Sequence, residues 1–403
     1  MVALLIAFYS GAQFATNLFW GRASDSIGRR PVMLLASAST CVGTFGFGFS
    51  QSIPAMFAFR LVPGLLNGAV VVVRTIIGEI TTGRENKASQ ISYVIGPIIG
   101  GYLAQPCHRF LRLCEDKRLP LLREFPFALP SIIVSILSAL ALVVGNFFIE
   151  ESLDKKTMAA DSERSPLLAP DSSEEEMVKE TSPGWRDILT APIIHIVLSY
   201  FLMTLHTACF DQIFPAYLAT RPVPSRLLFH LNGGLSLPAS TVANFISGAG
   251  AVSIVLMLGV FPPVSARISS KTSLRLSLLL YPFTYFALPY LALLPLSSAW
   301  ARILSVSAVA CAKVLAFVFS SSETAILLNA CAPEARTLEF VNGLGQAAAA
   351  GGRAIGPAVM GLFVELGSKV DCSALGWYYL ALVPVIGAVR GCWVVDASIE
   401  EQN

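Results

Sequence analysis

Eleven long apolar runs divide this chain, and they constrain its fold more than any other feature. Each run is close to the roughly 20 residues that a helix needs to cross the hydrocarbon of a bilayer. Only α-helices and closed barrels satisfy their backbone polar groups inside lipid, and barrel strands would be about 10 residues of alternating polarity. The runs therefore predict an all-α, polytopic membrane protein, with spans near residues 1–20, 31–51, 53–80, 89–105, 126–149, 190–220, 238–262, 273–296, 299–330, 337–366 and 374–395.

The composition agrees, because only 13% of the 403 residues are charged, whereas a soluble domain carries about 25%. The net charge of +2, without a block of basic residues, gives no sign of a nucleic-acid partner. The eight cysteines lack metal-ligand spacing, so we expect no metal and no soluble cofactor. Cys107 and Cys114 share one predicted loop, either as a disulfide or as two free thiols.

A polar segment separates two membrane halves. Residues 150–189 are rich in Ser, Pro, Glu and Asp and cannot bury enough apolar surface to become ordered. We expect a disordered cytoplasmic linker there, between an N-terminal half at 1–149 and a C-terminal half at 190–396, with a tail at 397–403. The distribution of Lys and Arg favours this orientation, although the opposing loop at 108–123 is also basic.

One short motif inside the linker bears on localisation. Glu163 to Leu168 matches an acidic dileucine sorting signal. The motif would direct the protein to a vacuolar or endosomal membrane, and a plain linker would leave it in the plasma membrane.

The loop after the first run combines two glycines, an acid and two arginines at Gly21, Asp25, Gly28, Arg29 and Arg30. The glycines permit close helix ends, and the acid and the arginines can form ionic contacts that open and close. Glu79, near the same membrane face, is a natural partner for one of the arginines. We predict a conformational lock, the alternative being an ordinary basic anchor.

Polar residues inside the spans are costly and mark candidate functional positions. Arg60, Asn67 and Arg74 recur every seven residues and would share one face of a continuous helix. A second stripe in the tenth run consists of Asn342, Gln346 and Arg353. We expect both stripes to face a central cavity, while a structural role near an interface is the alternative, most plausibly for Arg60.

Asp211 lies in the sixth run and is the candidate for carrying a proton, the alternative being a solvated acid near the outer interface. Lys313 and Glu323 lie in the ninth run and would pair with acids or with each other. His206 and Asp211 also match the His-x4-Asp pattern of lipid acyltransferases. An offset of five on a helix separates them by about 140°, so an enzyme would require a break in that helix.

Together these motifs resemble the major facilitator superfamily. The Gly21 to Arg30 loop is similar to the signature between its second and third helices, and Arg60 to Gly64 resembles the fourth-helix motif of its proton-coupled members. A fifth-helix packing motif of drug:proton antiporters resembles Gly96, Pro97, Gly100 and Gly101, which Gly356 and Pro357 echo in the tenth run. The amino-acid sequence around these motifs is similar to that of the fungal zinc-induced-facilitator-like group.

The resemblance implies two six-helix halves and a monomeric secondary transporter in the lipid bilayer that exchanges small organic solutes for protons. The family has twelve helices, so we expect its first helix to be absent here. Because that helix often carries binding groups, a transport-inactive membrane protein is the alternative. The Glu150 to Asp154 stretch lacks the His of the plant signature, so a zinc-related role is not supported.

Overall fold

The computed structural model describes residues 2–68, 72, 124–125, 128–148, 189–223, 229–293, 299–331 and 335–400, apart from a few side chains, Asp25 among them. Several predicted features lie outside the described residues: the span at 89–105, residues 150–188 of the linker, Arg74, Glu79, Gly96, Pro97, Gly100, Gly101, Cys107 and Cys114. Every regular element in the described part is a helix, and one isolated β-bridge joins Val223 and Asn232. The all-α fold class is confirmed.

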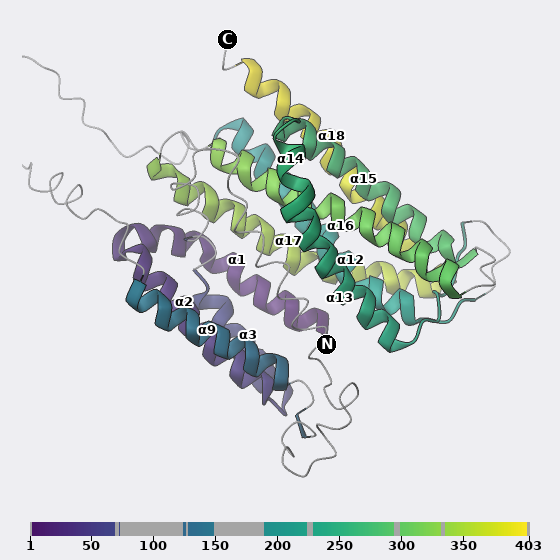
Figure 1. Cartoon of the computed structure of the whole chain (residues 1–403), viewed down its shortest axis with the longest axis horizontal. Helices are drawn as coiled ribbons and strands as arrows, with labels where there is room; N and C mark the ends of the chain where they lie inside the picture. The colour runs from purple at the N-terminus through teal and green to yellow at the C-terminus, as the bar shows by residue number, and fades with distance from the viewer. Residues whose placement is uncertain are drawn as a thin grey trace, which may run out of the picture.

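An N-terminal group consists of α1 (Val2–Ile27), α2 (Arg29–Gly48), α3 (Ile53–Leu66) and α9 (Ala128–Phe148). Here α2 packs along α9 and α3, and α1 packs along α3 (Figure 1). Glycines bring the helices close, because a Cβ added at Gly43 would lie 2.7 Å from Pro63, and one at Gly64 would lie 2.9 Å from Ala12. Lipid is as apolar as these side chains, so close packing rather than removal from water holds the helices together.

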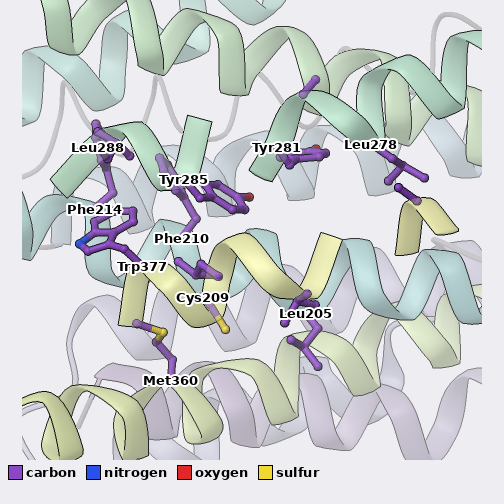
Figure 2. Close-up of a cluster of buried hydrophobic side chains, with 14 of the residues drawn as sticks. Leu205, Cys209, Phe210, Phe214, Leu278, Tyr281, Tyr285, Leu288, Met360 and Trp377 are labelled. Atoms are coloured by element: carbon purple, nitrogen blue, oxygen red, sulfur yellow. The ribbon is translucent and has the colours of Figure 1, made fainter. Parts of the chain in front are cut away.

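A C-terminal group contains α12 (Ala191–Ala219), α13 (Ala239–Val255), the π-helix η2 (Leu256–Val260), α14 (Phe261–Ser265), α15 (Ser270–Tyr290), the 3-10 helix η3 (Leu291–Leu293), α16 (Ala299–Ala330), α17 (Ala335–Lys369) and α18 (Leu375–Glu400). In this group α12 packs along α17 and α18, and α15 packs along α16 and α18. A buried cluster of aromatic and aliphatic side chains fills the space between α12, α15, α17 and α18 (Figure 2).

One predicted span, at 238–262, is built from three consecutive pieces, α13, η2 and α14. The cause lies in Pro262 and Pro263, which have no N–H to donate to the carbonyls four residues earlier. The N–H of Phe261 bonds instead to the carbonyl of Leu256, five residues back. That spacing defines a π-turn, which absorbs the lost hydrogen bonds without ending the span.

Seven of the described helices are long and apolar enough to cross a bilayer, and Ile53–Leu66 and Leu375–Val389 are shorter apolar helices. With 26 residues, α1 also has the length of a span. Most helix bounds lie within a few residues of the predicted runs. The last helix continues to Glu400, so the first residues of the predicted tail are helical.

The two groups meet along α1 and α17, the most extensive contact between any two helices of the described part. In Figure 1, α17 lies between α1 on one side and α12 and α16 on the other. A Cβ added at Gly351 would lie 3.3 Å from the ring of Phe14, so α17 meets α1 at a small residue. This arrangement makes α17 the element through which the two groups touch.

The third predicted span, 53–80, is described only as far as Gly68 and at Val72. Within it α3 ends at Leu66, and Val72 is helical again, with its N–H bonded to the carbonyl of Gly68 at 3.3 Å. Pro63 has already removed one helical donor, and Asn67 leaves the helix with φ −84° and ψ 65°. Gly68 then packs against Trp20 and Val32, where a Cβ would lie only 2.8 Å from Val32. The helix is therefore interrupted at Asn67, between Arg60 and the third residue of the predicted stripe, Arg74, which lies outside the described residues.

Candidate functional site

The central feature of the candidate site is an ion pair between two transmembrane helices. The Lys313 ammonium on α16 lies 3.0 Å from the Asp211 carboxylate on α12. The Lys313 side chain is 10% exposed, whereas the Asp211 side chain is 68% exposed. A charged side chain at the centre of a span costs roughly 3 kcal/mol on insertion scales, and an opposite charge in hydrogen-bonding contact offsets part of that cost.

Aromatic rings form the surroundings of this pair. The Lys313 Nζ lies 4.6 Å from the ring centroid of Phe210 and 5.3 Å from that of Phe317. Cation–π attraction at a desolvated site is worth about 2 kcal/mol. Phe210 is itself fixed by stacking on Phe214, with centroids 4.8 Å apart, and on Tyr285, at 5.4 Å (Figure 2). Lys313 is therefore held in place on one side by the carboxylate and on the other by rings.

A second polar layer lies about one to two helical turns from the first. His206 Nδ1 and the Tyr285 hydroxyl are 3.0 Å apart, and the Tyr281 and Ser320 hydroxyls are also 3.0 Å apart. These two hydrogen bonds connect α12, α15 and α16. His206 and Asp211 lie on the unbroken helix α12 and bond to different partners. The His-x4-Asp pair consequently does not form an acyltransferase dyad.

Sequence reasoning missed a polar cluster in the N-terminal group. The Tyr9 hydroxyl accepts hydrogen bonds from the Gln13 and Asn67 side-chain amides, each at 3.1 Å. Tyr9 and Gln13 are four residues apart on α1, a spacing that places them on one face. That spacing was visible in the sequence. Asn67, which was predicted as a cavity residue, lies at the interruption that follows Leu66 and bonds to this cluster.

The predicted stripe on α17 is partly assembled. The Gln346 amide donates to the Tyr200 hydroxyl on α12 at 3.4 Å. Asn342 is buried on the same helix, and Arg353 is half-buried and forms no ion pair within the described part of the chain. A Cβ added at Gly356 would lie 2.7 Å from the carbonyl of Leu205, so this glycine sets the closeness of α17 to α12. Pro357 follows it inside the helix.

The predicted loop motif is almost entirely helical, because α1 continues through Gly21 to Ile27 and α2 begins at Arg29. Gly28 alone makes the turn, with φ 106° and ψ 156°. Arg30 donates a hydrogen bond to the carbonyl of Asn146, near the end of α9, where a cation is favoured by the helix dipole. The contacts of Asp25 and Glu79 lie outside the described residues.

Other predicted residues have separate surroundings. The Arg60 guanidinium stacks 4.2 Å above the ring of Phe47 on α2, and Glu323 is fully buried on α16. Glu323 lies ten residues from Lys313, about 15 Å along the helix, so these two do not pair. Among the described residues, no group of three or more His, Cys, Asp and Glu side chains could hold a metal ion.

A family model for the Major Facilitator Superfamily matches residues 1–357. The chain belongs to the major facilitator superfamily. It is 29% identical to the major facilitator superfamily multidrug transporter mfsB of Aspergillus fumigatus, across 98% of this chain and 76% of that protein. It is also 25% identical to the protein ZINC INDUCED FACILITATOR-LIKE 1 of Arabidopsis thaliana, across 95% of this chain and 80% of the relative.

A solved structure gives the same fold. The crystal structure of the human organic anion transporter MFSD10 (TETRAN) matches with a TM-score of 0.61, across 96% of this chain and 83% of that one, at 17% identity. The family resemblance stated from the motifs is confirmed. This member of the superfamily is therefore an integral membrane protein and a secondary transporter of small molecules, not an enzyme.

Proposed function

We propose that this transporter is a proton-coupled antiporter that exports small organic solutes by alternating access, with Asp211 as the group that carries the proton. The observation that carries the proposal is the ion pair between Asp211 on α12 and Lys313 on α16. Ionisable residues inside transmembrane helices commonly mark ion pathways. The name of the Aspergillus relative, a multidrug transporter, supports organic compounds as the exported solutes.

The two partners differ in a way that favours Asp211 as the proton carrier. The Asp211 side chain is exposed, whereas Lys313 is buried against Phe210 and Phe317. In this proposal a proton reaches the carboxylate from its exposed side. Once Asp211 is neutral, Lys313 retains only the ring faces among the described contacts, and its cost inside the span rises. Protonation would thus weaken one link between α12 and α16 and favour a second conformation.

The remaining features complete the proposal. Residues 1–149 and 190–396 are the two halves that rock against each other, joined by a cytoplasmic linker at 150–189 and followed by the tail at 397–403. The turn at Gly28, with Asp25, Arg29, Arg30 and Glu79, is the lock that closes one end. The transporter works as a monomer in the plasma membrane or in a vacuolar or endosomal membrane.

The test of this proposal separates proton-driven accumulation from downhill exchange in reconstituted vesicles. We expect Asp211→Asn to abolish accumulation of a fluorescent organic cation under a pH gradient, while exchange of labelled for unlabelled solute continues at a similar rate. An amide cannot carry the proton, but it still fills the space of the carboxylate. Continued exchange shows that the variant is folded and binds the solute.

A double variant distinguishes coupling from a structural role. In Asp211→Asn/Lys313→Met both charges are removed, so no buried charge is left without its partner. A purely structural ion pair predicts that this double variant regains accumulation. We expect it to remain uncoupled, and recovery of uphill transport would overturn the role of Asp211.

A further inference from the structure

A cavity of about 330 Å³ lies at the end of the C-terminal group where α12 finishes, remote from Ala191 at its beginning. It is bounded by the last turns of α12 and α15, by η3 and by the beginning of α18. None of the described residues that line it is Asp, Glu, Lys, Arg or His. Its volume is at the lower end of the range of small-molecule sites, about 300–1,000 Å³. It is separate from the Asp211–Lys313 pair, because neither residue lines it.

Two aromatic side chains form a fixed wall of this cavity. Trp377 packs edge-on against Tyr217 at 5.2 Å and against Phe210 at 6.0 Å between centroids. The Tyr217 hydroxyl donates to the carbonyl of Leu288 at 2.8 Å, which sets the orientation of its ring. In Figure 2, Trp377 reaches from α18 toward Phe210 and Phe214 of α12. The wall is therefore part of the buried aromatic cluster and does not depend on a ligand for its shape.

A hydrogen-bonded loop forms the rim. The amide of Ser373 donates to the Asn232 side-chain oxygen at 2.8 Å, and the amide of Gly233 donates to the Ser373 hydroxyl at 2.9 Å. Gly233 has φ +83°, a conformation that favours glycine, and a Cβ added at Gly234 would collide with the carbonyl of Tyr217. These bonds join the segment after α12 to the turn before α18. The rim is thus preorganised, as the rims of binding sites usually are.

The chemistry of the lining defines what the cavity accepts. A charged ligand would lose water without gaining a counter-charge from the described walls, which carry no ionised side chain. Rings of Tyr217 and Trp377 and the flat faces of Pro222 and Pro289 suit an aromatic ligand. The indole N–H of Trp377 makes no hydrogen bond within the described part of the chain, so it is a donor for a ligand acceptor.

We propose that this cavity is a binding site for uncharged aromatic small molecules that carry a hydrogen-bond acceptor, distinct from the ion-pair site. The proposal is independent of proton coupling, since it rests on the walls and rim alone. Trp377 also contacts Phe210, the ring on which Lys313 rests. A ligand at the cavity would therefore contact the same aromatic cluster that holds the ion pair.

Tryptophan fluorescence of the purified full-length protein tests the proposal. The probe is 4-bromoacetanilide, an uncharged aromatic amide whose bromine quenches a tryptophan in contact with it. We expect a saturable component of quenching in the wild type that is lost in Trp377→Phe. The same component should persist in Trp300→Phe, a matched control that removes an 80% exposed tryptophan instead.

Two comparisons define the site and its chemistry. Ala292→Phe fills the cavity while it keeps all tryptophans, and we expect at least a tenfold loss of apparent affinity. If Trp377→Phe fails to fold, the loss of affinity in Ala292→Phe tests the proposal by itself. The matched anion 4-bromobenzoate should bind at least tenfold more weakly than the amide. Quenching that rises linearly, or that is equal in the wild type and Ala292→Phe, would show only partition into detergent and would overturn the proposal.

Discussion

At the scale of single residues, the turn between α1 and α2 depends on Gly28. Its φ of 106° and ψ of 156° lie in a region that is essentially restricted to glycine. We expect Gly28→Ala to destabilise the protein by about 1–3 kcal/mol, measured as a lower unfolding temperature in detergent. Gly11→Ala is the matched control, because a Cβ there has no neighbour within 4 Å in the described part of the chain and the helix favours alanine. Equal stability of the two variants would contradict this role of Gly28.

The candidate site was predictable only as a set of residues. Asp211 and Lys313 stand out because charges are rare in apolar runs, but their pairing joins positions 102 residues apart. That contact depends on how α12 and α16 are rotated against each other, which hydropathy does not encode. The Tyr9 cluster was missed for a related reason, since Asn67 reaches Tyr9 only because α3 stops at Leu66.

At the scale of helices, the approach of α17 to α12 depends on small residues. A Cβ added at Gly352 would lie 2.4 Å from the Thr204 hydroxyl and 2.6 Å from the carbonyl of Phe201, so backbone as well as a side chain blocks it. We expect Gly352→Ala to separate the helices and to cost about 1–3 kcal/mol, as overpacking does. The measurement is the thermal unfolding of purified protein together with its transport rate.

Gly361→Ala is the control for that prediction. It changes the same helix at a glycine whose Cβ would have no neighbour within 4 Å among the described residues. Both variants gain one methyl group and the same helix propensity, so a difference between them isolates the contact with α12. A Gly352→Ala protein as stable as Gly361→Ala would show that α17 and α12 can move apart without cost.

Helix positions were largely predictable because lipid selects apolar runs of fixed length, and α12, α16 and α17 begin and end close to their predicted bounds. Two local departures within the predicted spans were not predicted. At Asn67–Gly68 and at Leu256–Val260 the chain leaves α-helical geometry within a few residues of a proline. A hydropathy pattern continues through such points, since it does not register a lost N–H donor or a close approach of backbones.

At the scale of the whole molecule, the rocking that we propose requires the contact between α1 and α17 to change. Phe14 and Gly351 face each other across it. In a variant that lacks the eight native cysteines, Phe14→Cys and Gly351→Cys should be joined by a short bifunctional maleimide. We expect the cross-linked protein to retain its fold but to exchange solute at least tenfold more slowly than the unmodified double variant.

A second pair of cysteines, too far apart to be joined, is the control for that cross-linking experiment. Gly361 lies ten residues further along α17, about 15 Å away, so Phe14→Cys paired with Gly361→Cys should not cross-link. This control also measures the effect of maleimide modification itself. Undiminished exchange in the cross-linked Phe14/Gly351 protein would mean that the two groups do not need to move at this contact.

The pairing of α1 with α17 also has a consequence for how the protein is made. About 300 residues lie between the two helices, and at roughly 5–20 residues per second the ribosome needs on the order of 15–60 s to synthesise them. During that interval α1 is already in the membrane, with Gln13 and Asn17, which are buried in the final structure, deprived of one neighbouring helix. Biogenesis of this chain therefore includes a waiting period in which its first helix needs a temporary partner, supplied by insertion factors or by the neighbouring helices α2 and α3.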